Sequence, residues 1–381
     1  MRLAFDATAL LGPRTGVGVF TSEVLHRLAR HDDLDVVAYG LTWSGRKALA
    51  GEVPDHIRVV RRPMAARPLR AAWRRADQPP IEWWTGAVDV VHGPNFVVPP
   101  SRRAAEFVTV HDLTCVRFPE LCTVDTLAYP SLIRRAVARG ATVHVVSSFV
   151  GDEVRDAFGL AADRVVMVPN GVTPLAAGDP SGDGPADAPT GWTLAGGDRY
   201  ILGLGTVEPR KGFPLLVRAF DELAAADPEL RLVIAGPDGW GADALSSAVQ
   251  ASPHRRRIVR LGWVDDTRRA ALLRGASVFA FPSIYEGFGL PPLEAMSAGA
   301  PVVCSDAGAL PEVVGDGALL VPSGDVTALA AALGAVLDHA DQADDLRRRG
   351  TARVARYDWD ATTAGLVEIY RRLAGGPSAR S

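Results

Sequence analysis

The stretch from Phe281 to Val303 constrains this chain more than any other. It reads FPSIYEGFGLPPLEAMSAGAPVV, and the apolar run that opens at Val278 is typical of a buried parallel strand. Pro291 and Pro292 suit the first turn of a helix, where a missing N–H costs nothing. The stretch therefore predicts a strand, a loop, a helix and a second strand, which is the repeating pattern of an α/β fold.

Two glutamates eight positions apart, Glu286 and Glu294, flank a glycine-bearing turn in this stretch. Glycine lets a backbone approach a ligand closely, and the N–H groups at a helix start favour negative charge. Such a loop can bind a phosphate and hydroxyl groups together, and a sugar nucleotide has both. The plainer interpretation is that Glu294 complements the helix dipole and Glu286 is a solvated loop residue.

Strand and helix patterns alternate along the whole chain, and its length of 381 residues predicts two domains. We expect the first domain at residues 1–180, the second at residues 181–357 and a last helix over residues 358–381. Residues 175–198 are rich in Gly, Pro, Ala and Asp, as is typical of a linker. The alternation predicts parallel sheets covered by helices.

The composition is that of an ordinary soluble protein, with 48% hydrophobic residues, 22% charged residues and a net charge of -3. This balance does not indicate nucleic-acid binding, and no run is long and apolar enough for a membrane span. The N-terminus predicts a strand and not a signal peptide, so we expect a cytoplasmic location. Three cysteines without CxxC spacing indicate neither a disulfide framework nor a zinc site.

Polar residues directly after the predicted strands are candidates, because ligands bind beyond the carboxyl ends of such strands. In the first half these residues are Asp6, His92, His111, Asp112, Ser147, Ser148, Asn170 and Gly171. A histidine at a strand end is more often structural than functional. We nevertheless select His111, because Asp112 adjoins it and polar groups recur at the neighbouring strand ends.

Two further loops stand between a strand and a helix. Gly16 and Gly18 occupy the place of a phosphate-binding loop, but Thr21 replaces the third glycine of a dinucleotide fingerprint. Arg210 and Lys211 lie in the corresponding loop of the second half, where two cations suit a diphosphate. An isolated Arg-Lys pair is usually surface charge, and its position in the loop favours the functional interpretation.

A basic segment, Arg58–Arg75, holds seven arginines and no acidic residue, and Trp73, Trp83 and Trp84 belong to or follow it. Basic residues with interleaved tryptophans can hold a protein against an anionic lipid surface. A solvated basic loop and helix explains the same residues, and we favour this second interpretation by a small margin.

The sequence Asp358-Trp359-Asp360 precedes the last predicted helix and has the form of a metal-binding DxD motif. We discount it, because Asp360 stands where an N-cap is needed and no second acidic cluster is evident. No residue is therefore assigned to a metal.

Taken together, these motifs resemble family 4 of the retaining glycosyltransferases, which have the two-domain GT-B fold. The resemblance spans nearly the whole chain apart from the basic segment and the linker. Its main pieces are DATALLGPRTGVGVF, DVVHGPNFVVPP, VTVHDLTCVRFPE, LGTVEPRKGF and FPSIYEGFGLPPLEAMSAGAPVV. It implies an α/β architecture with two Rossmann-like domains facing a cleft, the first binding the acceptor and the second the nucleotide sugar. The C-terminal helix would return to the first domain.

The resemblance also implies a role for each candidate residue. The catalytic group would be His111 against the donor sugar, Glu286 on its hydroxyls, and Arg210 with Lys211 on the diphosphate. The donor would be bound by Glu294 on the ribose, Val264 near the base, the backbone N–H groups of Phe288, Gly289 and Leu290, and Gly16 and Gly18 on the phosphates. Thr206 stands where many members carry a phosphate-binding arginine, so the role of Arg210 rests on similarity to an EPRK subgroup, many of whose members are mannosyltransferases.

A retaining reaction with a nucleophile and an acid requires two carboxylates about 5 Å apart, and the pattern supplies no such pair on the reactive face. We expect the leaving diphosphate to accept the proton of the incoming hydroxyl, while Arg210 and Lys211 stabilise its charge without a metal ion or other cofactor. The implied function is transfer of mannose from GDP-mannose to a hydroxyl of a saccharide or lipid-linked acceptor.

Several alternatives remain open. The donor could be UDP-glucose or UDP-N-acetylglucosamine, and a sugar-nucleotide epimerase can share the fold. A non-catalytic nucleotide-sugar-binding protein would be expected to lack Lys211 or one of the two glutamates, and this sequence keeps all three. Peripheral contact with the inner face of the membrane through Arg58–Arg75 would add an anionic lipid surface to the partners.

Overall fold

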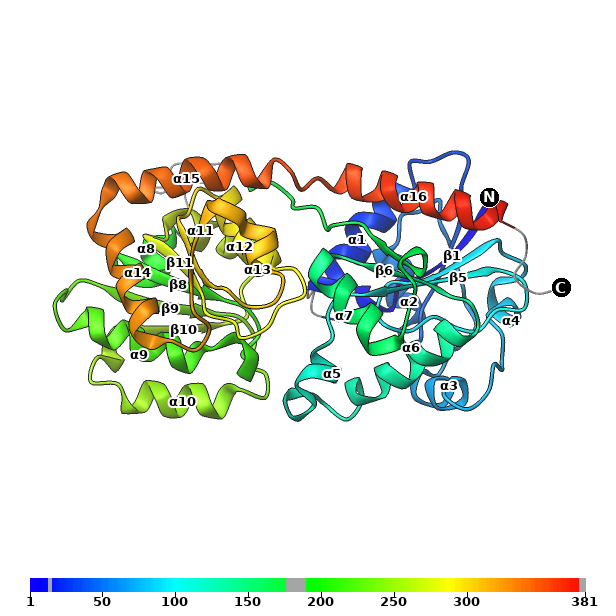
Figure 1. The fold of residues 1–381 in the computed structure, drawn as a ribbon, viewed down its shortest axis with the longest axis horizontal. Helices are drawn as coiled ribbons and strands as arrows, with labels where there is room; N and C mark the ends of the chain where they lie inside the picture. The colour runs from blue at the N-terminus through cyan, green and yellow to red at the C-terminus, as the bar shows by residue number, and fades with distance from the viewer. Residues whose placement is uncertain (13–15, 176–189, 377–381) are drawn as a thin grey trace. The chain divides into compact units, whose positions relative to one another are not determined.

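The computed structural model describes residues 1–12, 16–175 and 190–376, which form two compact units (Figure 1). Unit 1 consists of Met1–Gly171 and Asp358–Ser381, and unit 2 is Val172–Tyr357. The division falls before the predicted boundary at residue 180. Residues 176–189 of the predicted linker lie outside the described part, and the rest of it includes a short helix, α8 (Gly191–Ala195).

The described part of unit 1 is built on a seven-stranded parallel sheet with the order β3-β2-β1-β4-β5-β6-β7. Its strands are β1 (Arg2–Asp6), β2 (Asp35–Tyr39), β3 (Arg58–Val59), β4 (Val90–Gly93), β5 (Ala105–Val110), β6 (Thr142–Val145) and β7 (Val165–Met167). The helices are α1 (Gly16–Leu28), α2 (Arg46–Glu52), α3 (Ala66–Trp73), α4 (Glu82–Thr85), α5 (Thr114–Arg117), α6 (Tyr129–Ala138) and α7 (Ser148–Phe158). Strand order reverses between β1 and β4, which is the topological switch point of this sheet.

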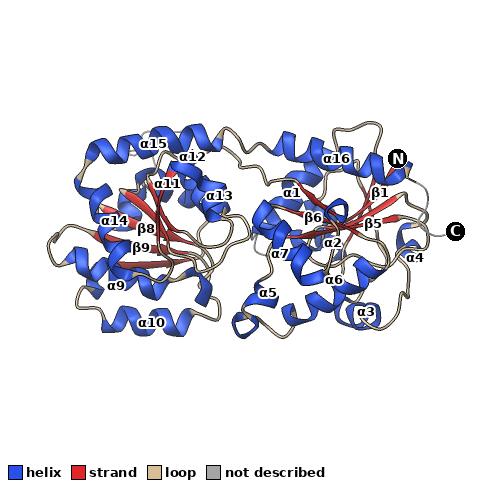
Figure 2. Ribbon diagram, in the orientation of Figure 1, coloured by secondary structure: helices blue, strands red, loops and turns tan. Residues whose placement is uncertain are grey.

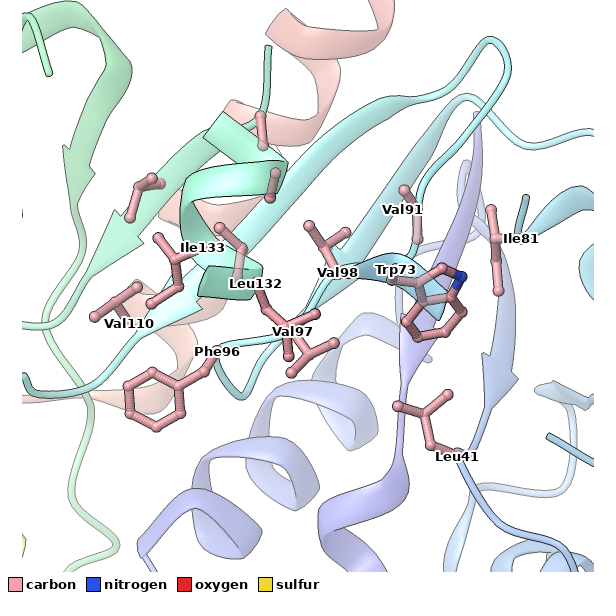
Figure 3. Packing of buried hydrophobic residues seen from close by; sticks show 14 of the residues in the cluster. Leu41, Trp73, Ile81, Val91, Phe96, Val97, Val98, Val110, Leu132 and Ile133 are labelled. Carbon is pink, nitrogen blue, oxygen red and sulfur yellow. The ribbon is translucent and has the colours of Figure 1, made fainter. Parts of the chain in front are cut away.

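Helices cover both faces of the unit 1 sheet, so the strands between its edge strands β3 and β7 are buried on both sides (Figure 2). The indole of Trp73, the last residue of α3, packs in one cluster with Val97 and with Leu132 of α6 (Figure 3). Beneath α1, Phe5 and Phe20 belong to a second cluster. Trp73 is only 1% exposed, so this residue of the basic segment contributes to the core and does not reach the surface.

The last helix of the chain, α16, packs along α1 in unit 1 (Figure 1) and is tied to the sheet by a buried chain of hydrogen bonds. Tyr370 Oη donates to His92 Nδ1 at 2.7 Å, and His92 Nε2 donates to Thr109 Oγ1 at 2.8 Å. Thr109 in turn donates to His144 Nδ1 at 2.9 Å, and His144 Nε2 donates to the Val168 carbonyl at 2.9 Å. These directions are assigned from the last acceptor, because a carbonyl cannot donate.

Burial lowers the pKa of His92 well below its usual value and that of His144 to about 3. Both imidazoles are therefore neutral at physiological pH, as the hydrogen-bond chain requires. His92, one of the polar residues at the predicted strand ends, is structural.

Helix α16 (Trp359–Gly375) begins one residue before the predicted N-cap at Asp360, and that prediction is wrong. Asp358 is the N-cap, because its side chain accepts from the Ala361 N–H at 3.0 Å. Asp360 lies in the first turn and accepts from Arg27 Nε of α1 at 2.6 Å. The two carboxylates of the DxD sequence therefore cap the helix and fasten it to α1.

The described part of unit 2 has a six-stranded parallel sheet with the order β10-β9-β8-β11-β12-β13. Its strands are β8 (Tyr200–Leu204), β9 (Arg231–Ala235), β10 (Ile258–Gly262), β11 (Val278–Phe281), β12 (Val302–Ser305) and β13 (Ala318–Val321). After α8, the helices are α9 (Phe213–Ala224), α10 (Ala242–Ala251), α11 (Asp266–Gly275), α12 (Leu290–Ser297), α13 (Leu310–Val314), α14 (Val326–Asp338) and α15 (Ala340–Val354). The switch point of this sheet lies between β8 and β11.

The core of unit 2 forms where α9 and α14 pack on the sheet. Phe213, Leu216 and Phe220 recur at helical spacing in α9 and join Leu329 and Leu333 of α14 in one buried cluster. The three cysteines of the chain are free thiols. Among the described helices, none is long and apolar enough to cross a membrane.

Candidate functional site

At the switch point of unit 2, the loops that follow β8 and β11 press against each other. The first loop ends in a one-turn 3-10 helix, η5 (Pro209–Lys211), and Gly212 follows with a φ of 68°. A Cβ at Gly212 would meet the Pro282 carbonyl oxygen at 2.2 Å, so glycine is required for this close approach. The Ile284 N–H donates to the Arg210 carbonyl at 2.8 Å. These contacts place Arg210 and Lys211 beside the loop that carries Glu286.

Three of the four predicted catalytic residues meet in one buried group, which we call the Lys211 cluster: Arg210, Lys211, Ser283 and Glu286. Glu286 Oε1 lies 2.6 Å from Lys211 Nζ and 2.8 Å from Arg210 Nη1. The hydroxyl of Ser283 donates to the same oxygen at 2.6 Å, so Oε2 takes part in none of these three contacts. Lys211 Nζ also lies 4.7 Å from the centre of the Phe281 ring, a cation–π contact.

The charges of this cluster determine the state of its carboxyl group. Burial by itself would raise the pKa of Glu286, but Arg210 and Lys211 outweigh it and lower the pKa to about 2. Burial also lowers the pKa of Lys211, and the neighbouring Arg210 acts in the same direction. Glu286 is therefore ionised at physiological pH and can accept hydrogen bonds, but it cannot serve as a general acid.

Glu294 lies in α12, and its carboxylate has a different partner. Its Oε1 accepts from Arg269 Nη1 of α11 at 2.7 Å. Burial raises the pKa of Glu294, and Arg269 opposes that rise. The pairing argues against the plainer interpretation, in which Glu294 only complements the helix dipole. Sequence reasoning missed Arg269, because an arginine in a surface-facing helix carries no local mark of its distant partner.

The glycine-bearing turn between the two glutamates is held in one conformation. Gly289 has a φ of 107° and is the N-cap of α12, and a Cβ there would meet Leu310 Cδ2 at 2.7 Å. The Phe288 ring packs edge-on against Tyr357, with centroids 5.5 Å apart. Because Pro291 and Pro292 lack an N–H, the donors before them at this helix start belong to Phe288, Gly289 and Leu290, which are the three predicted backbone contacts.

Val264 lies in the loop between β10 and α11, at the same carboxyl edge of the sheet but outside the Lys211 cluster. It is partly buried, and the neighbouring Trp263 is 61% exposed. Asp265, which follows, caps α11 by accepting from the Arg268 N–H.

The remaining predicted residues, Gly16, Gly18 and His111, belong to unit 1. The two glycines lie in the first turn of α1. His111 follows β5, and its Nε2 donates to the Pro94 carbonyl at 2.8 Å. Burial lowers the pKa of His111, so the ring is neutral and Nδ1 carries a lone pair.

The switch point of unit 1 holds a cavity of about 220 Å³, which we call the Asp6 pocket. It is lined by Asp6, Thr8, Ala9, Arg70, Pro94, Asn95 and Val97. Sequence reasoning named Asp6 as a strand-end residue without selecting it and counted Arg70 only as part of the basic segment. Asn95 was missed, although its place just after β4 is the mark that would have found it.

Much of the basic segment is engaged within unit 1. Arg58 Nη2 donates to the Thr85 carbonyl at 2.8 Å, and Arg62 Nη1 donates to the Trp83 carbonyl at 3.0 Å. The Trp83 side chain itself is 55% exposed. Within the described ranges, no group of three or more His, Cys, Asp or Glu side chains could hold a metal ion.

Two family models match the chain. One, described as "Glycosyltransferase Family 4", matches residues 14–174, and the other, described as "Glycosyl transferases group 1", matches residues 188–353. Together they cover the sheet of unit 2 and, apart from β1, the sheet of unit 1.

Among curated proteins, O-antigen chain mannosyltransferase B of Escherichia coli is 30% identical over 397 residues, covering 98% of this chain and 100% of that protein. Phosphatidyl-myo-inositol mannosyltransferase of Mycolicibacterium smegmatis is 35% identical, over 55% of this chain and 52% of that protein. The first similarity extends across both units.

Among solved structures, sucrose-phosphate synthase of Thermosynechococcus elongatus superposes with a TM-score of 0.75 at 20% identity, covering 98% of each chain. HepE of Anabaena, in complex with UDP and glucose, superposes with a TM-score of 0.74 at 18% identity, covering 98% of this chain and all of the other. At these identities the likeness shows the fold, which is GT-B with two Rossmann-like domains.

Proposed function

This chain belongs to glycosyltransferase family 4, and from that premise we propose that it transfers mannose from GDP-mannose to a hydroxyl of a saccharide or lipid-linked acceptor, with retention. The observation that carries the proposal is the Lys211 cluster. It gathers two cations and one ionised carboxylate at the switch point of unit 2, where sheets of this type bind their ligands.

The cations of the cluster suit a departing nucleoside diphosphate. Arg210 offers a planar fork of donors and Lys211 a point charge, and both now share one oxygen of Glu286. A bound diphosphate would supply further oxygens to these donors, and Glu286 would then accept hydrogen bonds from hydroxyls of the donor sugar. Each donor aimed at the leaving group is worth about 3 kcal/mol of the barrier.

The proposed reaction exchanges one bond at the anomeric carbon for another on the same face of the sugar. The bond to the diphosphate oxygen breaks, the bond to the acceptor oxygen forms, and the acceptor proton passes to the departing diphosphate. Glu286 is a poor base for this proton because its pKa is about 2. The cations would neutralise the leaving group without a metal ion, and His111 would contact the donor sugar from unit 1.

The choice of mannose rests on the names of the relatives, two of which are mannosyltransferases. The Lys211 cluster itself recognises a diphosphate and sugar hydroxyls, which UDP-glucose and UDP-N-acetylglucosamine also carry. A base near Val264 and a ribose on Glu294 would complete the donor site.

The test is a thermal-shift and turnover screen of the full chain against nucleotide sugars, with magnesium and with EDTA. We expect GDP or UDP to stabilise the protein in EDTA and a Lys211→Ala variant to fold but lose that stabilisation. Lys47→Ala, which removes an exposed lysine from α2 of unit 1, is the matched control. Stabilisation that requires magnesium, or that survives Lys211→Ala, would contradict the proposal.

Incubation with donor alone separates the transferase from an epimerase. A transferase should show at most slow hydrolysis of the donor until an acceptor is added. Rapid release of free nucleotide and an epimerised sugar without acceptor would favour the epimerase.

We also propose peripheral binding to the inner face of the membrane through the basic segment. Arg61, Arg67, Arg74 and Arg75 are exposed, as is Trp83, which supports contact with anionic lipid. Equal sedimentation with neutral and anionic vesicles at low salt would refute it.

A further inference from the structure

We propose that a surface pocket at the amino end of β10 in unit 2 binds a ligand through a phosphate monoester group, with Arg255 and Arg256 as the residues that pair with the phosphate. The pocket, which we call the Arg255 pocket, has a volume of about 330 Å³. Its lining residues are Pro253, His254, Arg255, Arg256 and Arg257. The family resemblance assigns no role to any of them, and the proposal does not depend on the proposed function.

The Arg255 pocket lies away from the proposed donor site of the same unit. Its arginines form a one-turn 3-10 helix, η6 (Arg255–Arg257), that leads directly into β10. Val264, expected near the base of the donor, follows the other end of β10, and the Lys211 cluster also lies at that carboxyl edge of the sheet. Because a five-residue strand spans roughly 16 Å, a ligand in the Arg255 pocket would not occupy the place of a nucleotide sugar.

The third arginine of the pocket, Arg257, is fixed by contacts within unit 2. Its Nη1 donates to the Asp227 carbonyl and its Nη2 to the Ala224 carbonyl, each at 2.5 Å. Both carbonyls lie at or just after the end of α9, and the guanidinium carbon lies 5.8 Å from the centre of the Phe220 ring in the same helix. The segment is thereby fastened to α9, and its two other arginines are carried on a fixed backbone.

His254 adds a hydrogen-bond donor to the pocket. Arg257 Nη2 lies 2.8 Å from His254 Nδ1. Because an arginine can only donate, Nδ1 accepts this bond and the ring hydrogen lies on Nε2. The imidazole also packs edge-on against Phe220, with ring centroids 6.5 Å apart, and Nε2 has no partner among the residues that the structure describes. The ring is therefore held in place with an available N–H group.

Three consecutive arginines occur twice in the chain, and the two triplets differ in their partners. In α15 every arginine of the triplet forms an ion pair with an aspartate one turn earlier. These pairs are Arg347 with Asp344, and both Arg348 and Arg349 with Asp345. Arg255 and Arg256 are exposed, and across residues 1–12, 16–175 and 190–376 neither guanidinium has an ion pair or a hydrogen bond. The chain thus neutralises one triplet and leaves charge on the other unpaired.

Two aspartates of unit 2 lie next to the pocket, and their carboxylates have other partners. Asp227 accepts from Arg199 Nε at 2.6 Å, and its second oxygen accepts two backbone N–H groups. Asp221 accepts from the hydroxyl of Ser252 at 2.5 Å. The positive potential of the exposed arginines is therefore available to attract an anion from solvent.

The donors of the pocket indicate a phosphate monoester. Each exposed guanidinium can bond two oxygens of a phosphate, and the imidazole N–H supplies a further donor. A phosphate monoester carries a charge of about −1.5 to −2 at pH 7, more than a carboxylate does. The volume of about 330 Å³ lies near the lower end of the roughly 300 to 1,000 Å³ of ligand sites, which leaves room for a small organic group beside the phosphate. A free metabolite and a phospholipid headgroup both offer this chemistry.

The test is a phosphorus NMR titration of the full chain with glycerol 3-phosphate at low salt. We expect a dissociation constant of about 1 mM, and Arg255→Gln/Arg256→Gln should weaken binding at least about tenfold. The matched control is Arg348→Gln/Arg349→Gln, which removes two exposed but paired arginines from the same unit. Lys211→Ala controls for phosphate binding at the Lys211 cluster and should leave the titration unchanged.

Vesicles distinguish the two sources of phosphate. Phosphatidic acid in a neutral bilayer presents the same monoester on a surface, and sedimentation compares the wild type with Arg255→Gln/Arg256→Gln. Weaker sedimentation of the variant would identify a lipid headgroup as the ligand. Equal sedimentation together with weaker binding of glycerol 3-phosphate would identify a free metabolite. The wild type is the reference because the exposed arginines of Arg58–Arg75 can contact the same lipid in both proteins.

The exposed arginines make no side-chain hydrogen bonds among the described residues, so their glutamine variants should fold, and an unfolding curve checks this. The single variants repeat the titration if the pair unfolds. Unchanged binding in the folded Arg255→Gln/Arg256→Gln variant would overturn the proposal, as would an equal loss in the control pair or a loss confined to Lys211→Ala. So would the absence of binding below about 10 mM glycerol 3-phosphate. Failure of every nucleotide sugar to support turnover would refute the proposed function instead and leave this titration as it is.

Discussion

The switch points of the two sheets each bury an acidic side chain near an arginine, yet their chemistry is opposite. Glu286 touches two cations, and its pKa falls to about 2. Asp6 faces Arg70 without an ion pair, and its pKa rises to about 6. Burial raises the pKa of both carboxyl groups, so the direct contacts decide the outcome.

This difference separates two ways of preparing a site for a ligand. In the Lys211 cluster the cations already share a carboxylate oxygen, so an anionic ligand would rearrange existing ion pairs. In the Asp6 pocket the two charges stand apart beside a cavity, so a ligand would add hydrogen bonds without displacing any. The first arrangement suits a diphosphate and the second suits hydroxyl groups.

The largest expected effect tests the charge of the Lys211 cluster. Lys211→Met should lower turnover by about 10²- to 10³-fold, because it removes one of the cations proposed to stabilise the leaving group. The measurement is steady-state turnover with the donor that the nucleotide-sugar screen identifies. Lys47→Met is the control, and unchanged turnover in Lys211→Met would remove the cluster from the mechanism.

The next effect is on stability. Glu286→Gln should lower the free energy of unfolding at pH 7 by about 3 kcal/mol, because it leaves the buried ammonium of Lys211 without its carboxylate and leaves Arg210 with Glu208 alone. The lowered pKa of Glu286 means that its stabilisation is present above pH 4.5 and is lost as the pH falls through about 2. Denaturant unfolding should therefore show a smaller difference at pH 3 than at pH 7.

Glu222→Gln removes an exposed acid from α9 of the same unit and should change stability little. Equal effects of the two glutamine variants would mean that the ion pairs of Glu286 contribute nothing measurable.

In unit 1 we expect the opposite change in stability, a gain when the buried carboxylate is removed. Asp6→Asn should raise the free energy of unfolding at pH 8 by about 2 kcal/mol, because burying the ionised carboxylate is costly. The raised pKa means that wild-type stability from this group is fully present below pH 3.8 and is lost as the pH rises through about 6. Urea unfolding at pH 8 and pH 4 should show the higher stability of the variant only at pH 8. A variant that is less stable than the wild type at pH 8 would contradict the claim that burial of this charge is costly.

The smallest expected effect concerns the hydrogen bond that joins the last helix to the sheet of unit 1. Tyr370→Phe should destabilise unit 1 by about 1 kcal/mol, because His92 Nδ1 loses its donor. Glu368→Gln, on the exposed side of α16, is the control. If the two units unfold in separate transitions, only that of unit 1 should move, and a shift of both would show that they unfold together.

Local sequence was enough to identify the charged residues of the Lys211 cluster but not Ser283, because glycines, adjacent cations and spaced glutamates mark the loops that carry the charges. It was not enough for Arg269 or for the Asp6 pocket, whose members come from separate elements with no common motif. Trp73 and His92 show that local sequence can also suggest a role that the fold does not use. Trp73 suggested contact with a membrane surface and His92 a place in the site, but tertiary packing buries both.

By itself the sequence determined that this protein is a two-domain α/β chain of parallel strands, because the periods of its strands and helices are local properties. Only the tertiary structure decided which strands are neighbours, where each sheet has its switch point and which charges touch. Those features depend on pairings between distant residues, and through burial and contact distance the pairings give Glu286 and Asp6 their opposite behaviour.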